Sequence, residues 1–399
     1  MEYYIEDLID MIKKDNDVNF IGLALTSHQT DGIDASLKYL KQNGVEPKGY
    51  ILILAHYLTG RGISKNDFLQ NSEKIKFIDF RLEFKTCVEN TKVKIKNRIL
   101  AIDYLLKKHD GKDLYIIATN AHYLWLALFT INIPNRNIKF ILIDDGTGSY
   151  LNNYRNQRSI GLMSAGNNRS FFKDTILSLK VIFRSFFSKI LDSMLAKQDR
   201  IIDNRLYTVK NQNSNFVIVN NTSVVKYYKQ TYTEKATLID INVKDALEGC
   251  ILINTQCLEE NQIVSNREDY FLYDTIIRQL KAFHYNNIVI KMHPRESDIH
   301  KYDFFDVTVL PKTAKSQEEI LTMLDNKPLC IISIYSSVLL NAYALFDIPV
   351  ISLAKIFINE FPHHSMNALL HEYIRTFEKQ ILFPTSVREL LSIIESIDK

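Results

Sequence analysis

Short apolar runs alternate with helix-like stretches along this chain, and this alternation limits the possible folds more than any other feature. The strand-like runs lie at residues 19–25, 50–54, 75–79, 114–118, 138–143 and 215–219 in the first half, and at 250–254, 287–292, 307–310, 329–334 and 348–353 in the second. Apolar runs without strict alternation are typical of strands buried on both faces of a parallel sheet. The pattern therefore predicts repeated β-α-β units.

The intervals between the runs carry helix patterns. The candidates are residues 33–42, 92–108, 122–130, 269–283, 316–324 and 337–345, and a last helix follows Ser386, which forms a capping-box pattern with Glu389. A chain of 399 residues is too long for one typical core. We predict an α/β protein with two Rossmann-like domains, at residues 1–238 and 239–399, divided within the mixed stretch 230–248.

Composition and charge narrow the class of protein. The chain is 46% hydrophobic and 24% charged, which is ordinary for a soluble globular protein, and its net charge of +3 does not indicate a nucleic-acid partner. No window holds the roughly 18 uncharged apolar residues that a membrane span needs. The acidic N-terminal segment lacks a signal-peptide pattern. We therefore expect a cytoplasmic protein.

The cysteines and histidines give no metal signature. Cys87, Cys250, Cys257 and Cys330 lack the spacing of metal ligands, and buried reduced thiols are the state expected in a reducing cytoplasm. The adjacent histidines at 363 and 364 have no third ligand at metal spacing. The chain also has no P-loop and no dinucleotide-binding glycine motif. We expect neither a metal nor a cofactor.

Residues 171–195 depart from the β-α-β pattern. Apolar side chains recur there at helical spacing, interleaved with Lys173, Lys180, Arg184 and Lys189. A basic amphipathic helix can lie on an anionic membrane surface or present charge to a polyanion. A helix packed on its own domain, with lysine side chains that reach out to solvent, would show the same pattern. Both interpretations stay open.

Three polar motifs directly follow strand-like runs, and the carboxyl ends of strands are where open α/β sheets bind ligands. The first motif is Asp144-Asp145-Gly146-Thr147-Gly148. A carboxylate beside another carboxylate ionises less readily and gains basicity, which suits a general base. The glycines permit a tight turn and a close approach of the backbone to a ligand. A plain turn would use the same residue types.

The second motif is Lys291-Met292-His293-Pro294. Histidine is the usual proton donor near neutral pH. Pro294 biases His293 toward an extended backbone, which would give the ring a fixed direction. Lys291 would favour an anionic ligand. The alternative is a turn histidine without a chemical role.

The third motif is Ser336-Ser337, at the start of the helix candidate 337–345. A serine at this place is a good N-cap. The helix N-terminus and its free amides also make an anion site, so a structural cap and a phosphate cradle are compatible.

Other polar loops end strands of the two predicted sheets. Their candidate contacts are Asn254, Gln256, Gln29, Asn120 and His122. The first two could touch a nucleotide base or ribose. For each of the five, an ordinary polar loop is the alternative.

Together the motifs resemble those of bacterial sialyltransferases of the glycosyltransferase B type. The closest resemblance is to capsule polysialyltransferases, with lipooligosaccharide sialyltransferases as relatives. Residues 142–150 are similar to the acidic motif of the capsule enzymes almost residue for residue, residues 290–296 are similar to their His-Pro motif, and Ser336-Ser337 stands where their serine pair falls. The resemblance implies two domains that face each other across a cleft.

The resemblance also implies a role for each motif. Asp145 would be the general base that deprotonates the acceptor hydroxyl, and Asp144 would orient it. His293 would protonate or stabilise the departing phosphate, which Ser336 and Ser337 would hold. The donor would be CMP-sialic acid, attacked in one inverting displacement without a metal ion.

Extension of a sialic-acid polymer in capsule synthesis is the favoured interpretation, with an anionic glycan as acceptor. A transferase that caps a terminal galactose, an enzyme with another activated sugar, and a non-catalytic glycan-binding or assembly subunit remain alternatives. We expect candidate partners at the inner-membrane surface or in a capsule-assembly complex.

Overall fold

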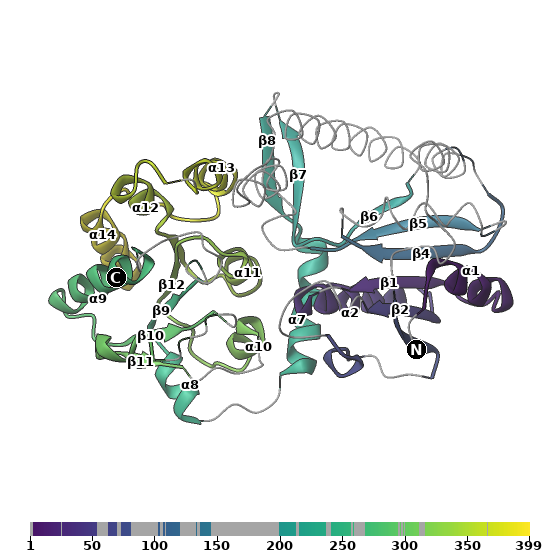
Figure 1. Cartoon of the computed structure of the whole chain (residues 1–399), viewed down its shortest axis with the longest axis horizontal. Coiled ribbons are helices and arrows are strands. Elements are labelled where there is room, and N and C mark those ends of the chain that lie inside the picture. The colour runs from purple at the N-terminus through teal and green to yellow at the C-terminus, as the bar shows by residue number, and fades with distance from the viewer. Residues whose placement is uncertain are drawn as a thin grey trace, which may run out of the picture. The chain divides into compact units, whose positions relative to one another are not determined.

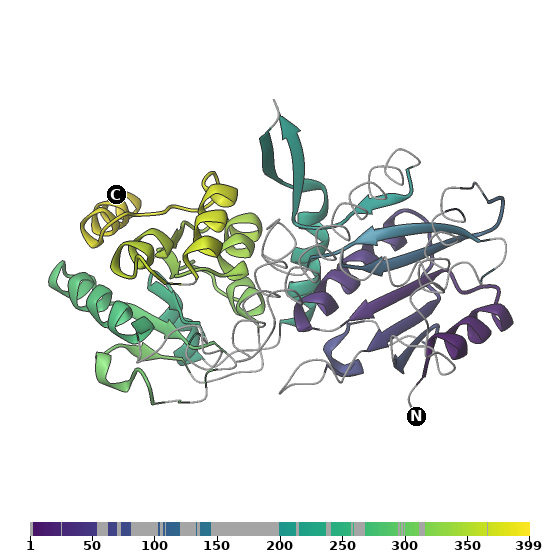
Figure 2. The same cartoon turned by 45° about the horizontal axis from the view of Figure 1, so that its top comes forward.

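The computed structural model divides into two compact units, each with its own sheet (Figures 1 and 2). It describes residues 3–24, 26–53, 63–69, 73–80, 109–119, 136–144, 199–212, 215–236, 241–256, 268–293, 300–310, 316–364 and 366–399, with single residues 103, 107, 133, 258, 296 and 298. Of these, the first unit holds the residues within Met1–Ser149, Arg155–Thr208 and Asn221–Thr231. The second holds those within Val209–Asn220 and Tyr232–Lys399.

The first unit contains a parallel sheet in the order β3-β2-β1-β4-β5-β6. Its strands are β1 (Phe20–Ala24), β2 (Gly49–Ile53), β3 (Ile75–Asp79), β4 (Asp113–Ala118), β5 (Asn137–Leu142) and β6 (Ile201–Asp203). Its described helices are α1 (Ile5–Lys14), α2 (Ser27–Gln42), the 3-10 turn η1 (Lys65–Asp67) and the start of α7 (Thr222–Lys235). This strand order is the Rossmann order, with its switch point between β1 and β4.

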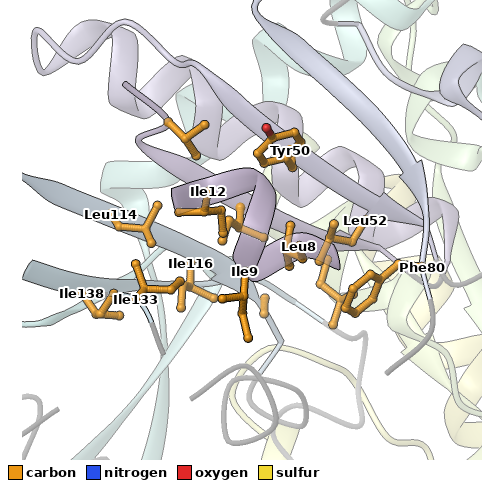
Figure 3. Packing of buried hydrophobic residues seen from close by; sticks show 14 of the residues in the cluster. Leu8, Ile9, Ile12, Tyr50, Leu52, Phe80, Leu114, Ile116, Ile133 and Ile138 are labelled. Carbon is orange, nitrogen blue, oxygen red and sulfur yellow. The ribbon is translucent and has the colours of Figure 1, made fainter. Parts of the chain in front are cut away.

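The sheet of the first unit is buried on both faces because neighbouring strand residues point to opposite sides. On one face, Leu8, Ile9 and Ile12 of α1 pack on alternate residues of the strands (Figure 3). On the other face, Ile33 and Leu37 of α2 pack on the remaining set. The continuous apolar runs in the sequence therefore reflect two cores around one sheet.

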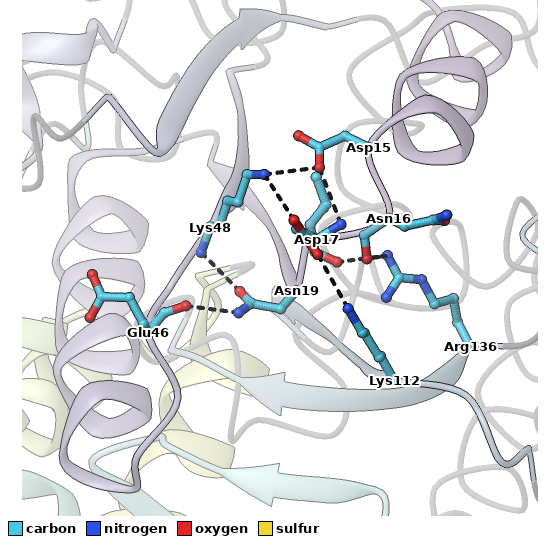
Figure 4. Close-up of polar contacts among 9 residues, drawn as sticks. Asp15, Asn16, Asp17, Asn19, Glu46, Lys48, Lys112 and Arg136 are labelled. Atoms are coloured by element: carbon cyan, nitrogen blue, oxygen red, sulfur yellow. Dashed lines mark hydrogen bonds and ion pairs between the residues drawn. The ribbon is translucent and has the colours of Figure 1, made fainter.

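A polar cluster joins the amino ends of these strands (Figure 4). The Lys48 ammonium lies 3.0 Å from an Asp15 carboxylate oxygen, and Lys112 lies 3.2 Å from Asp17. Arg136 donates hydrogen bonds to the carbonyl oxygens of residues 16 and 18. The hydrogen bond from Lys48 is the main cause that lowers the Asp15 pKa. This edge of the sheet is closed by structural contacts, which leaves the carboxyl edge for ligands.

The second unit contains a second parallel sheet, in the order β11-β10-β9-β12-β13. Its strands are β9 (Ile251–Asn254), β10 (Ile288–Lys291), β11 (Thr308–Val309), β12 (Cys330–Ser333) and β13 (Val350–Ser352). The helices are α8 (Ile241–Leu247), α9 (Glu268–Ala282), η2 (Asp303–Phe305), α10 (Gln317–Thr322), α11 (Ser337–Phe346), α12 (Ala354–Glu360), α13 (Asn367–Phe377) and α14 (Val387–Asp398). If these five strands are numbered 1 to 5 along the chain, their order in the sheet is 3-2-1-4-5, as for the first five strands of the first unit.

The predicted α/β class with parallel sheets is confirmed, and most predicted strands agree with the structure within two residues. The prediction of a parallel strand at 215–219 is wrong. β8 (Asn215–Asn220) pairs with β7 (Tyr207–Gln212) in a separate two-stranded sheet. Only residues 213–214 separate the two strands, which is too short for the crossover that a parallel pair needs.

Helix ends follow their capping residues. The predicted helix 33–42 begins earlier, at Ser27, because Thr26 caps it and accepts a hydrogen bond from the Gln29 amide at 3.4 Å. Ser386 caps α14 as predicted, but the Glu389 carboxylate accepts from the amide of Thr385 instead of closing the box. The strands β6 and β7 and the helices α1, α7, α8, α12 and α13 were not predicted. The predicted helices at 92–108, 122–130 and 171–195 lie essentially outside the described residues.

Among the helices of the described residues, none combines the length and apolar character needed to cross a bilayer.

Two of the four cysteines lie at the amino ends of neighbouring strands of the second sheet, Cys250 just before β9 and Cys330 at the start of β12. Cys250 and Cys330 are free and buried, as predicted, whereas Cys87 and Cys257 are outside the described part. Burial raises the pKa of Cys250 to about 12 and also raises that of Cys330. Both thiols therefore stay protonated and unreactive near neutral pH.

We expect iodoacetamide at mildly alkaline pH to leave Cys250 and Cys330 unmodified in the folded protein and to label both in urea, because only unfolding exposes the thiols. Peptide mapping by mass spectrometry reads each site separately. Equal labelling of these two peptides with and without urea would contradict their place in the core.

Candidate active site

The second sheet has its switch point between β9 and β12, and polar side chains connect the two strands there. The Gln256 amide nitrogen donates to the Ser333 hydroxyl at 3.3 Å, and Ser333 donates to the Asn254 carbonyl at 2.9 Å. All three residues are buried. Among the described residues, the Asn254 side-chain nitrogen has no hydrogen-bond partner. It is a donor that a ligand at this edge could satisfy.

His293 follows β10 on the neighbouring strand, and buried groups hold its backbone. Its amide donates to a Glu296 carboxylate oxygen at 2.7 Å and lies 3.0 Å from the Thr255 hydroxyl. The Glu296 amide in turn donates to the His293 carbonyl at 3.0 Å. The loop after β10 is therefore attached to the loop after β9.

Glu296 is the centre of this attachment. It is 1% exposed, and its two carboxylate oxygens accept hydrogen bonds from the hydroxyls of Thr255 and Tyr302. The Lys301 ammonium lies 3.9 Å away. Burial raises the Glu296 pKa, and the hydrogen bonds and Lys301 partly offset that rise. In the sequence, Glu296 is only the last residue of the segment 290–296 that resembles the His-Pro motif, and no role was predicted for it. The available signal was an acid three residues after the histidine.

Lys291 ends β10 and pairs in register with Asn254. Burial lowers the Lys291 pKa, and the Glu318 carboxylate only partly counters this. A desolvated cation of this kind gains stability when an anion binds beside it. That an anionic ligand binds at this edge stays a prediction.

Ser336 and Ser337 follow β12 and start α11. The Ser336 hydroxyl accepts a hydrogen bond from the Val338 amide at 3.2 Å, so the predicted cap is confirmed. The Tyr373 hydroxyl donates to the Ser336 carbonyl at 3.2 Å, which anchors the turn. The amino end of a helix favours negative charge, so this turn is suited to a phosphate as well as to capping.

Three neighbouring strands of one sheet thus carry the predicted residues of the second unit to one edge. These residues are Asn254, Gln256, Lys291, His293, Ser336 and Ser337. Pro294 lies outside the described residues. Within the described part of the chain, no three His, Cys, Asp or Glu side chains are grouped so that they could hold a metal ion.

In the first unit, Asp144 follows β5 and is only 3% exposed. Its Oδ2 accepts a hydrogen bond from the Leu206 amide at 2.7 Å, which attaches the acidic motif to the segment after β6. Tyr228 of α7 lies next to it and donates to the Asn204 carbonyl. Burial and the carboxylates of Asp144, Asp31 and Asp203 raise the Tyr228 pKa. Asp144 is a buried, positioned carboxylate.

Of the other residues predicted for the site in the first unit, the structure describes Gln29, and its predicted place in a loop is wrong. Gln29 does not lie in a loop, because it occupies the first turn of α2, where it is 1% exposed. The remaining candidates, Asp145, Gly146, Thr147, Gly148, Asn120 and His122, lie outside the described residues.

Comparison with protein-family models decides the family. The model described as alpha-2,8-polysialyltransferase matches residues 63–355, which is most of the chain and includes all three motifs. The chain belongs to the alpha-2,8-polysialyltransferase family. It is therefore a glycosyltransferase of the sialyltransferase class, and the predicted resemblance to polysialyltransferases is confirmed.

Three solved structures are similar to this family member at low sequence identity. The UDP-GlcNAc 2-epimerase of Neisseria meningitidis has a TM-score of 0.44 and 13% identity, over 95% of this chain and 93% of that one. An alpha/beta-galactoside alpha-2,3-sialyltransferase of Photobacterium phosphoreum has a TM-score of 0.41 and 12% identity, over 93% of this chain and 99% of that one. The glycosyltransferase B domain of a sialyltransferase from Photobacterium damselae has a TM-score of 0.39 and 13% identity, over 91% of this chain and 99% of that one. No curated protein sequence matched significantly.

Replacing Glu296 by alanine should destabilise this polysialyltransferase-family protein by about 2–4 kcal/mol, because buried hydroxyls and the His293 amide lose their acceptor. Glu296→Gln should cost less, since it keeps one acceptor oxygen. Urea unfolding measures both.

Glu395→Ala is the matched control, because Glu395 makes only an exposed pair with Lys399. It should change stability by no more than about 0.5 kcal/mol. Equal stability of the Glu296→Ala and Glu395→Ala proteins would show that the buried network does not hold the His293 loop.

Proposed function

We propose that the protein extends a sialic-acid polymer by transferring sialic acid from CMP-sialic acid to an anionic glycan that ends in sialic acid. The observation that carries this proposal is the meeting of Lys291, His293 and the Ser336-Ser337 turn at the switch point of the second sheet. A desolvated cation, a proton donor and a helix N-terminus suit the phosphate of a nucleotide sugar.

In this proposal the second unit binds the donor. The phosphate lies at Ser336 and Ser337, with Lys291 as the nearby positive charge. Asn254 and Gln256 contact the nucleoside through their amide groups. Glu296 keeps the His293 backbone in place, so that the ring faces the leaving oxygen. Gly146, Thr147, Gly148 and Pro294 shape the backbone around the substrates.

The acidic motif of the first unit activates the acceptor. Asp145 removes the proton from the acceptor hydroxyl, and Asp144, held by the Leu206 amide, orients that turn. The hydroxyl oxygen bonds to the anomeric carbon of sialic acid as the bond from that carbon to the phosphate oxygen breaks. His293 protonates or stabilises the CMP that departs. This single displacement inverts the anomeric centre.

The proposed reaction takes place without a metal ion. The charge that develops on the phosphate is stabilised by protein groups. The proposed location is the cytoplasm, where residues 171–195 would bind the inner-membrane surface or the anionic glycan, beside other capsule-assembly proteins.

We expect CMP release from CMP-sialic acid to be stimulated by oligosialic acid, with products that grow by sialic-acid units. Chromatography of the products and an assay of free CMP measure both quantities. Stimulation only by a galactose-terminated glycan would instead indicate a capping sialyltransferase, and no release with any acceptor would reject the proposal.

His293→Ala and Asp145→Ala should each lower the turnover by roughly 10²–10⁴-fold, which is the usual contribution of a positioned acid or base. His300→Ala is the matched control, because His300 is exposed and pairs with Asp303. If the His293→Ala and His300→Ala enzymes turned over equally, His293 would have no part in the transfer.

The lowered Lys291 pKa gives the donor site a pH dependence. As the pH rises through this pKa, the ammonium loses its proton and no longer pairs with phosphate. CMP affinity should therefore fall from neutral to alkaline pH, and Lys291→Met should weaken binding about 10-fold at neutral pH and remove the alkaline fall.

Calorimetric titration with CMP measures this effect. Lys244→Met serves as the control, because Lys244 lies on α8, away from the strand ends, and pairs with Asp325. A Lys291→Met protein that bound CMP like the parent at every pH would contradict the placement of the phosphate.

A further inference from the structure

A pocket of about 450 Å³ lies in the first unit, apart from the strand ends described above. It is formed where α2 and the start of α7 meet the edge strand β6. The lining residues are Tyr39, Asn43, Ile202, Asp203, Asn204, Thr222, Ser223, Val224, Lys226 and Tyr227. The volume is within the range of small-molecule sites, and aromatic walls with a few polar groups are typical of them.

The aromatic wall of the pocket consists of two tyrosines. The rings of Tyr39 and Tyr227 pack edge to face, with centroids 5.7 Å apart, and Tyr227 is 5% exposed. The hydroxyl-bearing side chains of Thr222 and Ser223 are exposed at the rim. Sugars bind such surfaces because their C–H groups pack on aromatic rings while their hydroxyls bond to the polar rim.

The charged side chains at the pocket indicate which kind of sugar it could bind. Asp203 supplies a carboxylate, but Arg205 already pairs with both of its oxygens, at 2.8 and 2.5 Å. The Lys226 ammonium lies 4.7 Å from the Tyr227 ring centroid and makes no ion pair with a described residue. The lining itself carries one negative and one positive charge, but because Arg205 pairs with Asp203, Lys226 is the charge that is left for a ligand. This favours a sugar that carries a carboxylate.

The pocket shares a wall with the segment that anchors the acidic motif. The Asn204 amide donates to the Leu142 carbonyl at 2.9 Å, two residues before Asp144. On α7, Tyr227 lines the pocket while the next residue, Tyr228, lies beside Asp144. A ligand in the pocket would thus lie close to the acidic motif without occupying it.

We propose that this pocket binds a carboxylated sugar residue of the acceptor chain, at a position away from the hydroxyl that reacts. Lys226 pairs with the sugar carboxylate, the tyrosines contact its apolar face, and the rim residues bond to its hydroxyls. The inference rests on the proposed function only in taking that sugar to belong to the acceptor. A second bound residue would make longer acceptors bind more tightly than short ones.

The test measures binding of oligosialic acid to the full-length protein by calorimetry, in the absence of donor. Lys226→Gln should weaken binding about three- to tenfold, as expected for loss of one charged hydrogen bond at an exposed site. Thr222→Trp, which fills the pocket from an exposed position, should weaken it at least as much. Neutral galactose oligomers of equal length should bind weakly to all proteins.

Lys229→Gln is the matched control, since it removes the same charge from the exposed side of α7 outside the pocket. It should bind oligosialic acid like the parent. If Lys226→Gln and Thr222→Trp both bound like this control, the proposed sugar site would be wrong, even in an enzyme that transfers sialic acid. Binding that depends on Lys226, without CMP release from CMP-sialic acid, would instead reject only the transfer function.

Discussion

Both units depend on the same constraint, a parallel sheet whose strand order reverses beside its first strand. Parallel neighbours require crossover connections, and at the reversal the two crossovers leave in opposite directions. The carboxyl edge between β9 and β12 therefore remains uncovered. In the second unit this edge carries an amide after β9, a lysine and a histidine at the end of β10, and a helix N-terminus after β12.

The chemistry of this edge depends on charges that the protein has already removed from water. Glu296 is buried and Lys291 is half-buried, and their removal from water raises the pKa of the first and lowers that of the second. Hydroxyl and amide donors surround Glu296, so it serves to hold the His293 loop. Lys291 has only partial compensation from Glu318, so a bound anion would stabilise it. The Glu296 carboxylate therefore has a structural role, whereas the Lys291 ammonium is suited to a ligand.

The first unit uses its carboxylates in a comparable way. Asp144 is bound to the backbone after β6, and Asp203 is paired by Arg205. Both contacts position the segment between β6 and α7, which forms one wall of the neighbouring pocket. The exposed Lys226 lies near the Asp203–Arg205 pair and is the positive charge of the proposed acceptor pocket.

The sequence by itself determined the α/β class, most strands, the cap at Ser336 and the family, because these follow from local periodicity and from short motifs. It also placed Lys291, His293 and the serine pair at strand ends. Only the tertiary structure decided that β8 leaves the parallel sheet, that Gln29 is inside a helix, and that Glu296 holds the His293 loop. These facts depend on contacts between distant segments, such as Thr255 with Glu296, and no local pattern encodes which buried donors will meet one carboxylate.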